Sequence, residues 1–187
     1  MADFVFETSL GFAAMAREES CLLGLTFGHQ SERDAIRALE RALTAKSVDG
    51  KLVDGRPYRG GEVEFVRPGE DEMIDRIRRF ADGELAEFDD LEVDGRHLTP
   101  FARKVVAACR EIPYGETRTY GELAKQAGRP GAARAVGSVM ARNRVPLIVP
   151  CHRVVPASGK LGGFSAPQGV AMKRRLLEME QAGIVCS

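Results

Sequence analysis

The pattern of apolar residues changes near residue 98, and this change constrains the fold more than any other feature of the chain. Before it, short apolar runs alternate with stretches of helical spacing. After it, the spacing is helical almost throughout. A chain of 187 residues can form one domain or two small ones. The pattern therefore predicts a first half of strands and helices, joined by a linker over residues 89–99 to an almost wholly helical second half.

Short apolar runs in the first half predict the strands of a small antiparallel sheet. These runs lie at residues 4–6, 10–12 and 22–27. Ser31 and Asp34 form a capping pair that predicts a helix over about residues 32–45. Apolar residues at 73, 74, 77 and 80 mark another helix. Between them, residues 48–69 are rich in Gly, Asp, Arg and Pro, which predicts a loop with at most a short strand around Val63 and Phe65.

The second half is expected to begin with a helix from Pro100 that Pro113 and Gly115 end. Thr119 can cap a short helix through residue 126, and a Gly-rich break at 128–131 follows it. Residues 132–142 resume the helical pattern, with a packing face at residues 135, 136 and 139. Two short helices joined by a Gly-containing turn match the helix-turn-helix arrangement, although this turn is generic.

Charge is divided unequally between the two halves, although the chain as a whole is neutral. Residues 1–97 carry 13 basic and 22 acidic side chains, and residues 98–187 carry 14 basic and 5 acidic ones. A basic half favours attraction to a polyanion, with the acidic half as a scaffold facing away from it. The alternative is a solvated imbalance without a partner.

Cysteine usage and the N-terminal sequence indicate a reducing, intracellular location. The four cysteines are scattered and form no CxxC pair, which argues against a zinc ribbon or a disulfide framework. The N-terminus has no basic region, and no apolar run approaches the roughly 20 residues that span a bilayer. We therefore expect a soluble protein with no membrane association, cytoplasmic or, in a eukaryote, nuclear.

The hexapeptide Pro150-Cys151-His152-Arg153-Val154-Val155 carries the strongest chemical signal. A thiol near cations or a base has a pKa below its free value of about 8.5 and becomes a nucleophile. His152 can supply or relay a proton, and Arg153 is expected to add positive charge beside the thiol. Taken alone, Cys151 is equally well read as a small buried apolar residue.

A wider set of motifs surrounds this hexapeptide. The chain carries Gly115-Glu116-Thr117-Arg118-Thr119-Tyr120, Ala132-Ala133-Arg134-Ala135-Val136-Gly137, Asn143, the Cys151 hexapeptide and Gly162-Gly163-Phe164-Ser165. With these it closely resembles the O6-alkylguanine-DNA alkyltransferase family over about residues 98–182. The first half matches only in its looser layout. The resemblance implies an α/β fold of two domains: a small ribonuclease-H-like scaffold domain over 1–97, and a mostly helical domain over 98–187 that has a helix-turn-helix, binds DNA and transfers the alkyl group.

The resemblance also implies direct-reversal DNA repair. An O6-alkylguanine, or an O4-alkylthymine, is flipped out of duplex DNA, and its alkyl group is transferred irreversibly to Cys151 in a single turnover. The second helix of the pair enters the minor groove, where its small residues Ala133, Gly137 and Ser138 permit close approach. Arg134 fills the gap left by the extruded base. Tyr120 helps to rotate the base and to neutralise the leaving guanine.

By the same resemblance, His152 deprotonates Cys151 through a bound water, and a glutamate completes the relay. Glu178 and Glu180 are the candidates on a last helix opened by Pro167. Glu180 shares the inward stripe with Lys173 and Leu177, and Glu178 is turned away from it by about 100°. Asn143 matches a hinge that ties the recognition helix to the Cys151 segment. The substrate pocket is expected at residues Met140, Val154, Phe164, Ser165 and Lys173, with Ser165 and backbone groups near Val154 reading the guanine.

Two departures from the family pattern stand out. Phe164 replaces a tyrosine of many members, so the phenolic hydroxyl that would assist the leaving guanine is missing. Cys21, His29 and His97 lack convincing zinc-ligand spacing, so we expect no metal and no cofactor. The resemblance also implies a monomer.

Three other functions stay open from the sequence. The first is a damage-binding protein that does not dealkylate, against which the retained Cys151 argues. The second is a transcription regulator that uses the helix-turn-helix alone. The third is a cysteine hydrolase, for which no oxyanion-hole signal is present.

Overall fold

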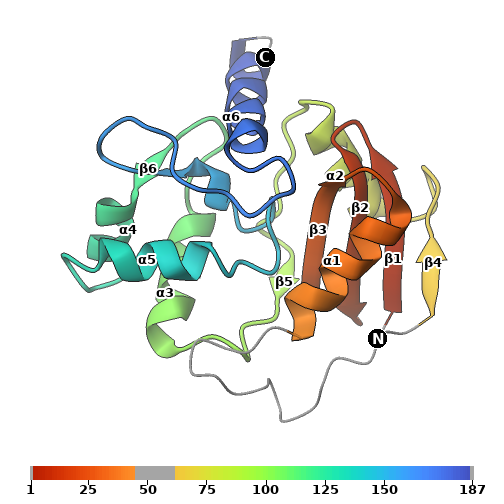
Figure 1. Ribbon diagram of the computed structural model, residues 1–187, viewed down its shortest axis with the longest axis horizontal. Helices are drawn as coiled ribbons and strands as arrows, with labels where there is room; N and C mark the ends of the chain where they lie inside the picture. The colour runs from red at the N-terminus through yellow and green to blue at the C-terminus, as the bar shows by residue number, and fades with distance from the viewer. Residues whose placement is uncertain (1, 45–61, 186–187) are drawn as a thin grey trace. The chain divides into compact units, whose positions relative to one another are not determined.

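The chain divides into two compact units, Met1–His97 and Leu98–Ser187 (Figure 1). The computed structural model describes residues 2–44 and 62–185. These residues form six α-helices and a mixed five-stranded sheet, an α/β architecture. Most of the loop expected over residues 48–69 lies outside the described residues, as does Cys186. No helix among the described residues is long and apolar enough to cross a membrane.

The first unit is built on a sheet with the strand order β4-β1-β2-β3-β5. Strands β1 (Ala2–Thr8), β2 (Gly11–Glu18) and β3 (Cys21–His29) pair in antiparallel fashion, as predicted. The two edge strands, β4 (Val63–Phe65) and β5 (Glu92–Val93), pair in parallel with β1 and β3. The predicted antiparallel sheet is therefore confirmed for these three strands but incomplete, because the two parallel edge strands make the sheet mixed. The segment predicted as a linker over 89–99 contains β5.

Strand β2 extends well beyond the predicted residues 10–12. Its sequence is rich in alanine, which has a low strand propensity, and it lacks an alternating pattern. The strand lies between β1 and β3, and the consecutive residues Ala13 to Ala16 are all buried. A central strand that is buried on both faces reads as a continuous apolar run, so the period-2 signal is lost.

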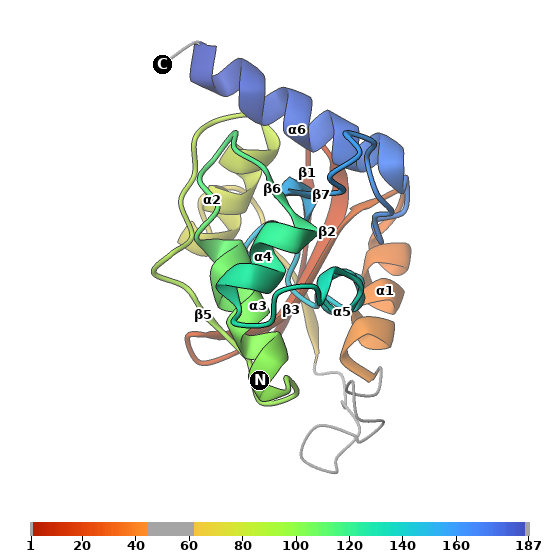
Figure 2. The ribbon, with the colours of Figure 1, turned by 90° about the vertical axis from the view of Figure 1, so that its left-hand side faces the viewer.

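Two helices cover opposite faces of this sheet, as Figures 1 and 2 show. Helix α1 (Glu32–Thr44) packs Ala35 and Leu39 against Val5, Ala14 and other buried residues of one face. Helix α2 (Glu72–Ala81) is preceded by Asp71, whose carboxylate accepts a hydrogen bond from the Ile74 amide and so caps the helix. Both predicted helices of this unit are confirmed.

The second unit is mostly helical, as predicted, and its first three helices contact one another. Thr99 caps α3 (Pro100–Arg110). Thr119 and Glu122 form a reciprocal capping box at the start of α4 (Tyr120–Gln126). After residues 127–132, α5 (Ala133–Met140) follows, and Figure 1 shows it beside α4. Helix α5 buries Val136, Val139 and Met140. The predicted packing residue Ala135 is exposed instead.

The last part of the unit carries the hexapeptide. A short 3-10 helix, η2 (Cys151–Arg153), leads into β7 (Val154–Val155), which pairs in parallel with β6 (Arg118–Thr119). Strands of two residues are too short to show a period, so this pair was not predicted. Helix α6 (Val170–Val185) begins three residues after the predicted Pro167. Gly169 has a φ of 54°, a left-handed conformation that does not belong inside an α-helix.

Candidate active site around Cys151

A tightly folded segment places Cys151 at the start of η2. The Val149 amide donates to the Val145 carbonyl at 2.9 Å, and the Cys151 amide donates to the Val149 carbonyl at 2.7 Å. Leu147, at the centre of this turn, has a φ of 73° although it is not a glycine, and it is buried. Left-handed backbone at such a residue costs of order 1–3 kcal/mol and is found where the surrounding structure enforces it. The turn is thus a strained support for the thiol.

Asn143 joins the segment after α5 to the thiol. Its amide nitrogen donates to the Val149 carbonyl at 2.8 Å and to Cys151 Sγ at 3.2 Å. Its side-chain oxygen accepts from the Val145 amide at 3.1 Å. The predicted contact between Asn143 and the Cys151 segment is therefore confirmed. A donor aimed at sulfur favours the thiolate form.

His152 and Glu180 form a buried pair. His152 Nε2 lies 2.7 Å from Glu180 Oε1, and both side chains are fully buried. Because an ionised carboxylate can only accept, Nε2 carries the proton and Nδ1 is the basic nitrogen of the neutral ring. This is the tautomer that a base acting on Cys151 requires.

The helical stripe of α6 explains why Glu180 reaches this position. Met172, Lys173, Leu176 and Glu180 are completely buried, Leu177 is partly buried, and Glu178 is exposed. The choice of Glu180 over Glu178 as the inward carboxylate is thus confirmed. Lys173 Nζ donates to the Val154 carbonyl at 2.6 Å, which fixes α6 to the residue after η2.

Arg153 does not add its charge directly beside the thiol. Its guanidinium donates from Nε to both oxygens of Glu180, at 3.1 and 3.0 Å, and from Nη2 to Oε1 at 3.0 Å. Nη1 donates to the Ile112 carbonyl at 2.7 Å. The expectation for Arg153 is wrong because the buried carboxylate is a stronger partner for a guanidinium than a thiol.

Burial sets the resting protonation of the thiol and the imidazole. It raises the pKa of Cys151, although the Asn143 hydrogen bond and the charge of Lys173 act in the opposite direction. It lowers the pKa of His152, against the hydrogen bond and the charge of Glu180. Both shifts favour the neutral forms. The thiol is therefore protonated at rest, with a neutral base beside it in the sequence.

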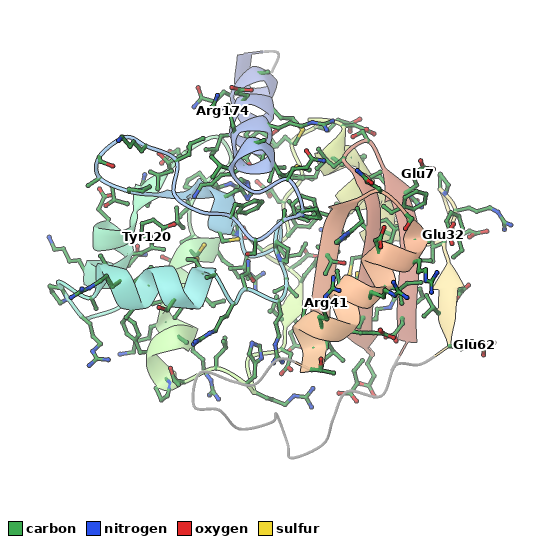
Figure 3. All side chains as sticks on the ribbon, viewed as in Figure 1. Glu7, Glu32, Arg41, Glu62, Tyr120 and Arg174 are labelled. Carbon is green, nitrogen blue, oxygen red and sulfur yellow. The ribbon has the colours of Figure 1, made fainter. Side chains whose placement is uncertain are left out.

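Tyr120, labelled in Figure 3, begins α4 and links it to two other segments. A methyl group built on Gly137 of α5 would stand 3.9 Å from the Tyr120 ring. One built on Gly162 would stand 3.1 Å from the Tyr120 hydroxyl, closer than most real contacts. Burial raises the pKa of Tyr120, so the phenol stays protonated and can donate.

The remaining predicted site residues lie on α5 and on the segment between β7 and α6. On α5, Arg134 and Ser138 are exposed, Ala133 and Gly137 are partly buried, and Met140 is buried. Val154 is fully buried. Phe164 is half-buried and Ser165 is exposed. The structure thus joins Asn143 to Cys151, His152 to Glu180 and Lys173 to Val154 by hydrogen bonds, and it leaves Arg134 and Ser138 exposed on α5.

The three residues considered as zinc ligands lie in the first unit. Cys21 and His29 are the first and last residues of β3, which places them roughly 26 Å apart at about 3.3 Å per residue. They cannot ligate one ion. Among residues 2–44 and 62–185, no group of three or more His, Cys, Asp or Glu side chains is placed to hold a metal ion.

Sequence reasoning missed two supports of the site. The Gly115 amide donates to Glu180 Oε2 at 3.0 Å, and the Arg153 guanidinium lies 5.6 Å from the centre of the Tyr114 ring. Both come from the loop after α3. The Gly115 motif was visible in the sequence, but nothing in it identifies the partner 65 residues away.

Comparison with known proteins decides the family. Residues 100–182 match the family model of the 6-O-methylguanine DNA methyltransferase, DNA binding domain. A methylated-DNA–protein-cysteine methyltransferase of Methanosarcina acetivorans is 48% identical over 118 residues, which cover 63% of this chain and 70% of the relative. The chain belongs to the methylated-DNA–protein-cysteine methyltransferase family.

Other family members extend this likeness. The Mycobacterium tuberculosis methylated-DNA–protein-cysteine methyltransferase is 51% identical over 109 residues, 58% of this chain and 64% of the relative, so the chain spans just under two thirds of that protein. A crystal structure of Mycobacterium tuberculosis OGT in complex with DNA is similar with a TM-score of 0.71 at 34% identity, covering 98% of this chain and 94% of that one.

Proposed function

We propose that this methyltransferase family member repairs DNA by transferring the alkyl group of O6-alkylguanine to Cys151. The observation that carries the proposal is the buried Cys151 thiol, which accepts a hydrogen bond from Asn143 and is followed in the chain by the His152–Glu180 pair. Family membership supports it. We assign DNA binding and transfer to residues 98–187, and a scaffold role with a ribonuclease-H-like layout to residues 1–97.

The reaction is a displacement at the alkyl carbon. The Sγ–H proton passes through a water molecule to His152 Nδ1, and the thiolate attacks the alkyl carbon. The carbon–O6 bond breaks and a carbon–sulfur bond forms, while guanine leaves with the electron pair and takes up a proton, which the Tyr120 phenol can supply. A thioether has no good leaving group, so the protein acts once. O4-alkylthymine offers the same carbon–oxygen bond and is a second candidate substrate.

The α4 and α5 helices form the DNA-reading helix-turn-helix. Helix α5 enters the minor groove, where Ala133, Gly137 and Ser138 leave room for the backbone of the duplex. Arg134, which is exposed on this helix, occupies the space of the flipped base. The protein binds as a monomer.

The flipped base enters a pocket bordered by Met140, Val154, Phe164, Ser165 and Lys173. Because the Val154 carbonyl already accepts from Lys173, its second lone pair remains for the guanine edge. The Ser165 hydroxyl donates a hydrogen bond to O6 of the guanine. The Phe164 ring stacks on the base but has no phenolic hydroxyl that could donate a proton.

Mass spectrometry of the protein after incubation with a duplex containing one O6-methylguanine tests the proposal. We expect a gain of one methyl group, about 14 Da, on Cys151 alone, with guanine restored and no more than one turnover per chain. Cys21 and Cys109 are internal controls, because both are free thiols. Tight binding of the lesion without added mass would identify a damage-recognition protein instead. Operator-specific binding that ignores the lesion would identify a regulator, and multiple turnover would identify a hydrolase.

Arg134→Ala is expected to slow single-turnover transfer by about tenfold or more, because the extruded base can then return to the stack. Affinity for undamaged duplex at fixed salt should fall much less, because a single arginine near the phosphates contributes little to non-specific binding. Arg142→Ala, at another exposed arginine just beyond α5, is the matched control. Equal effects of the two substitutions on transfer would show that Arg134 acts only as a charge.

A further inference from the structure

Glu180 receives more hydrogen bonds than a relay to His152 needs. Oε1 accepts from His152 Nε2, Arg153 Nε and Arg153 Nη2, and Oε2 accepts from Arg153 Nε and the Gly115 amide. Burial by itself raises the pKa of Glu180, but the hydrogen bonds and charges of His152 and Arg153 outweigh it and lower that pKa. The carboxylate is therefore a poor proton acceptor.

Arg153 and His152 also compete for one negative charge. A guanidinium is always protonated, so Arg153 and Glu180 already form a neutral pair in a dry interior. A proton on His152 would add an uncompensated charge there. The other groups around this network do not offset it. Lys173 of α6 is a cation that acts on His152. The Cys109 thiol of α3 interacts with Arg153 and Lys173, and the Tyr114 phenol interacts with Glu180 and Arg153, and both are neutral when protonated.

We propose that Arg153 is a positioning residue of the transfer reaction, because its bonds to both oxygens of Glu180 confine that carboxylate to orienting a neutral His152. In the reaction the Sγ–H bond breaks and an N–H bond forms on His152, which keeps the proton, while Glu180 remains a carboxylate throughout. The protonation of His152 in the resting protein does not depend on any reaction. The proton transfer from Cys151 to His152 rests on the proposed function.

The resting state can be measured without any transfer. The ¹⁵N resonances of the imidazole rings are followed by NMR over a pH titration of the whole protein, with His29 and His97 of the first unit as internal references. In Arg153→Met, Glu180 loses its cationic partner, so its negative charge is left to stabilise a proton on His152 and the His152 titration midpoint is expected to move to higher pH. In Arg153→Met/Glu180→Gln both charges are gone, and the midpoint is expected to return below that of the single variant. Arg153→Lys retains a charge but not the fork of donors, and should lie between wild type and Arg153→Met.

An unchanged His152 midpoint in folded Arg153→Met would overturn the inference. Should that variant not fold, the decision falls to Arg153→Lys, where an unchanged midpoint has the same meaning. A merely structural role of Arg153 would lower the melting temperature without this ordered set of midpoints.

The transfer rate supplies the second readout. Transfer needs a neutral His152, so the acid limb of the pH–rate profile of Arg153→Met should move to higher pH. We expect a loss of about tenfold or more near pH 6.5 that raising the pH largely restores. A loss that is the same at every pH would contradict the inference. Absence of any methyl transfer by wild-type protein would instead remove the proposed function, and the NMR titration would still decide the charge balance around His152.

Discussion

Cys151→Ala is expected to abolish alkyl transfer, by at least about four orders of magnitude in the single-turnover rate. No other described thiol can replace it. Cys109 is fully buried on α3, burial raises its pKa well above the usual value, and Cys21 lies in the other unit. The substitution removes one buried sulfur, so it should cost only about 1 kcal/mol of unfolding free energy. Transfer of a radiolabelled methyl group from duplex DNA and a thermal melt measure both effects.

Cys109→Ala is the matched control, since Cys109 is the other buried thiol among the described residues of the same unit. It should lose a similar amount of stability and still accept one alkyl group per chain. Lesion binding by Cys151→Ala should persist, because Arg134, Tyr120 and the pocket residues are untouched. Methyl transfer to Cys151→Ala would mean that the nucleophile has been misassigned.

Local signals account for the parts of the fold that were predicted correctly. The Thr119 cap, the Gly-rich break at 128–131 and the period of α6 each depend on residues within a few positions of one another. The same period distinguished Glu180 from Glu178. The parallel edge strands β4 and β5 depend instead on pairing between distant segments, and each is at most three residues long. The sequence did predict a short strand around Val63 and Phe65, but no pattern of local residues can identify its parallel pairing with β1 or the two-residue strand β5.

The sequence pointed to most of the residues that the structure places around Cys151 and Glu180, but not to all of their contacts. The hexapeptide and its companion motifs identified Cys151, His152 and Asn143. The prediction that the Arg153 charge lies beside the thiol was wrong, because its partner Glu180 lies 27 residues later on another helix. The left-handed Leu147 was also missed, since nothing about a leucine indicates a positive φ. Tertiary contacts decide both features.

Glu180→Gln is expected to damage stability and activity together. The substitution leaves the Arg153 guanidinium buried without its counter-charge, and breaking a buried ion pair on one side costs about 3–5 kcal/mol. The amide also presents donors where His152 Nε2 and Arg153 already donate, so the ring loses its orientation. We expect the transfer rate to fall by about 10² to 10⁴, the range attributed to a positioned general base. Urea unfolding and single-turnover transfer at a temperature where the variant is folded provide the two measurements.

Glu178→Gln, two residues earlier on the same helix, separates the loss of this particular carboxylate from the loss of any negative charge on α6. Glu178 is exposed, so its substitution should change the unfolding free energy by no more than about 0.5 kcal/mol and leave the transfer rate unchanged. The difference between the two variants measures what the hydrogen bonds of Glu180 to His152 and Arg153 contribute. A Glu180→Gln variant as stable as Glu178→Gln would mean that Arg153 finds another partner, and the role assigned to Glu180 in holding both His152 and Arg153 would have to be abandoned.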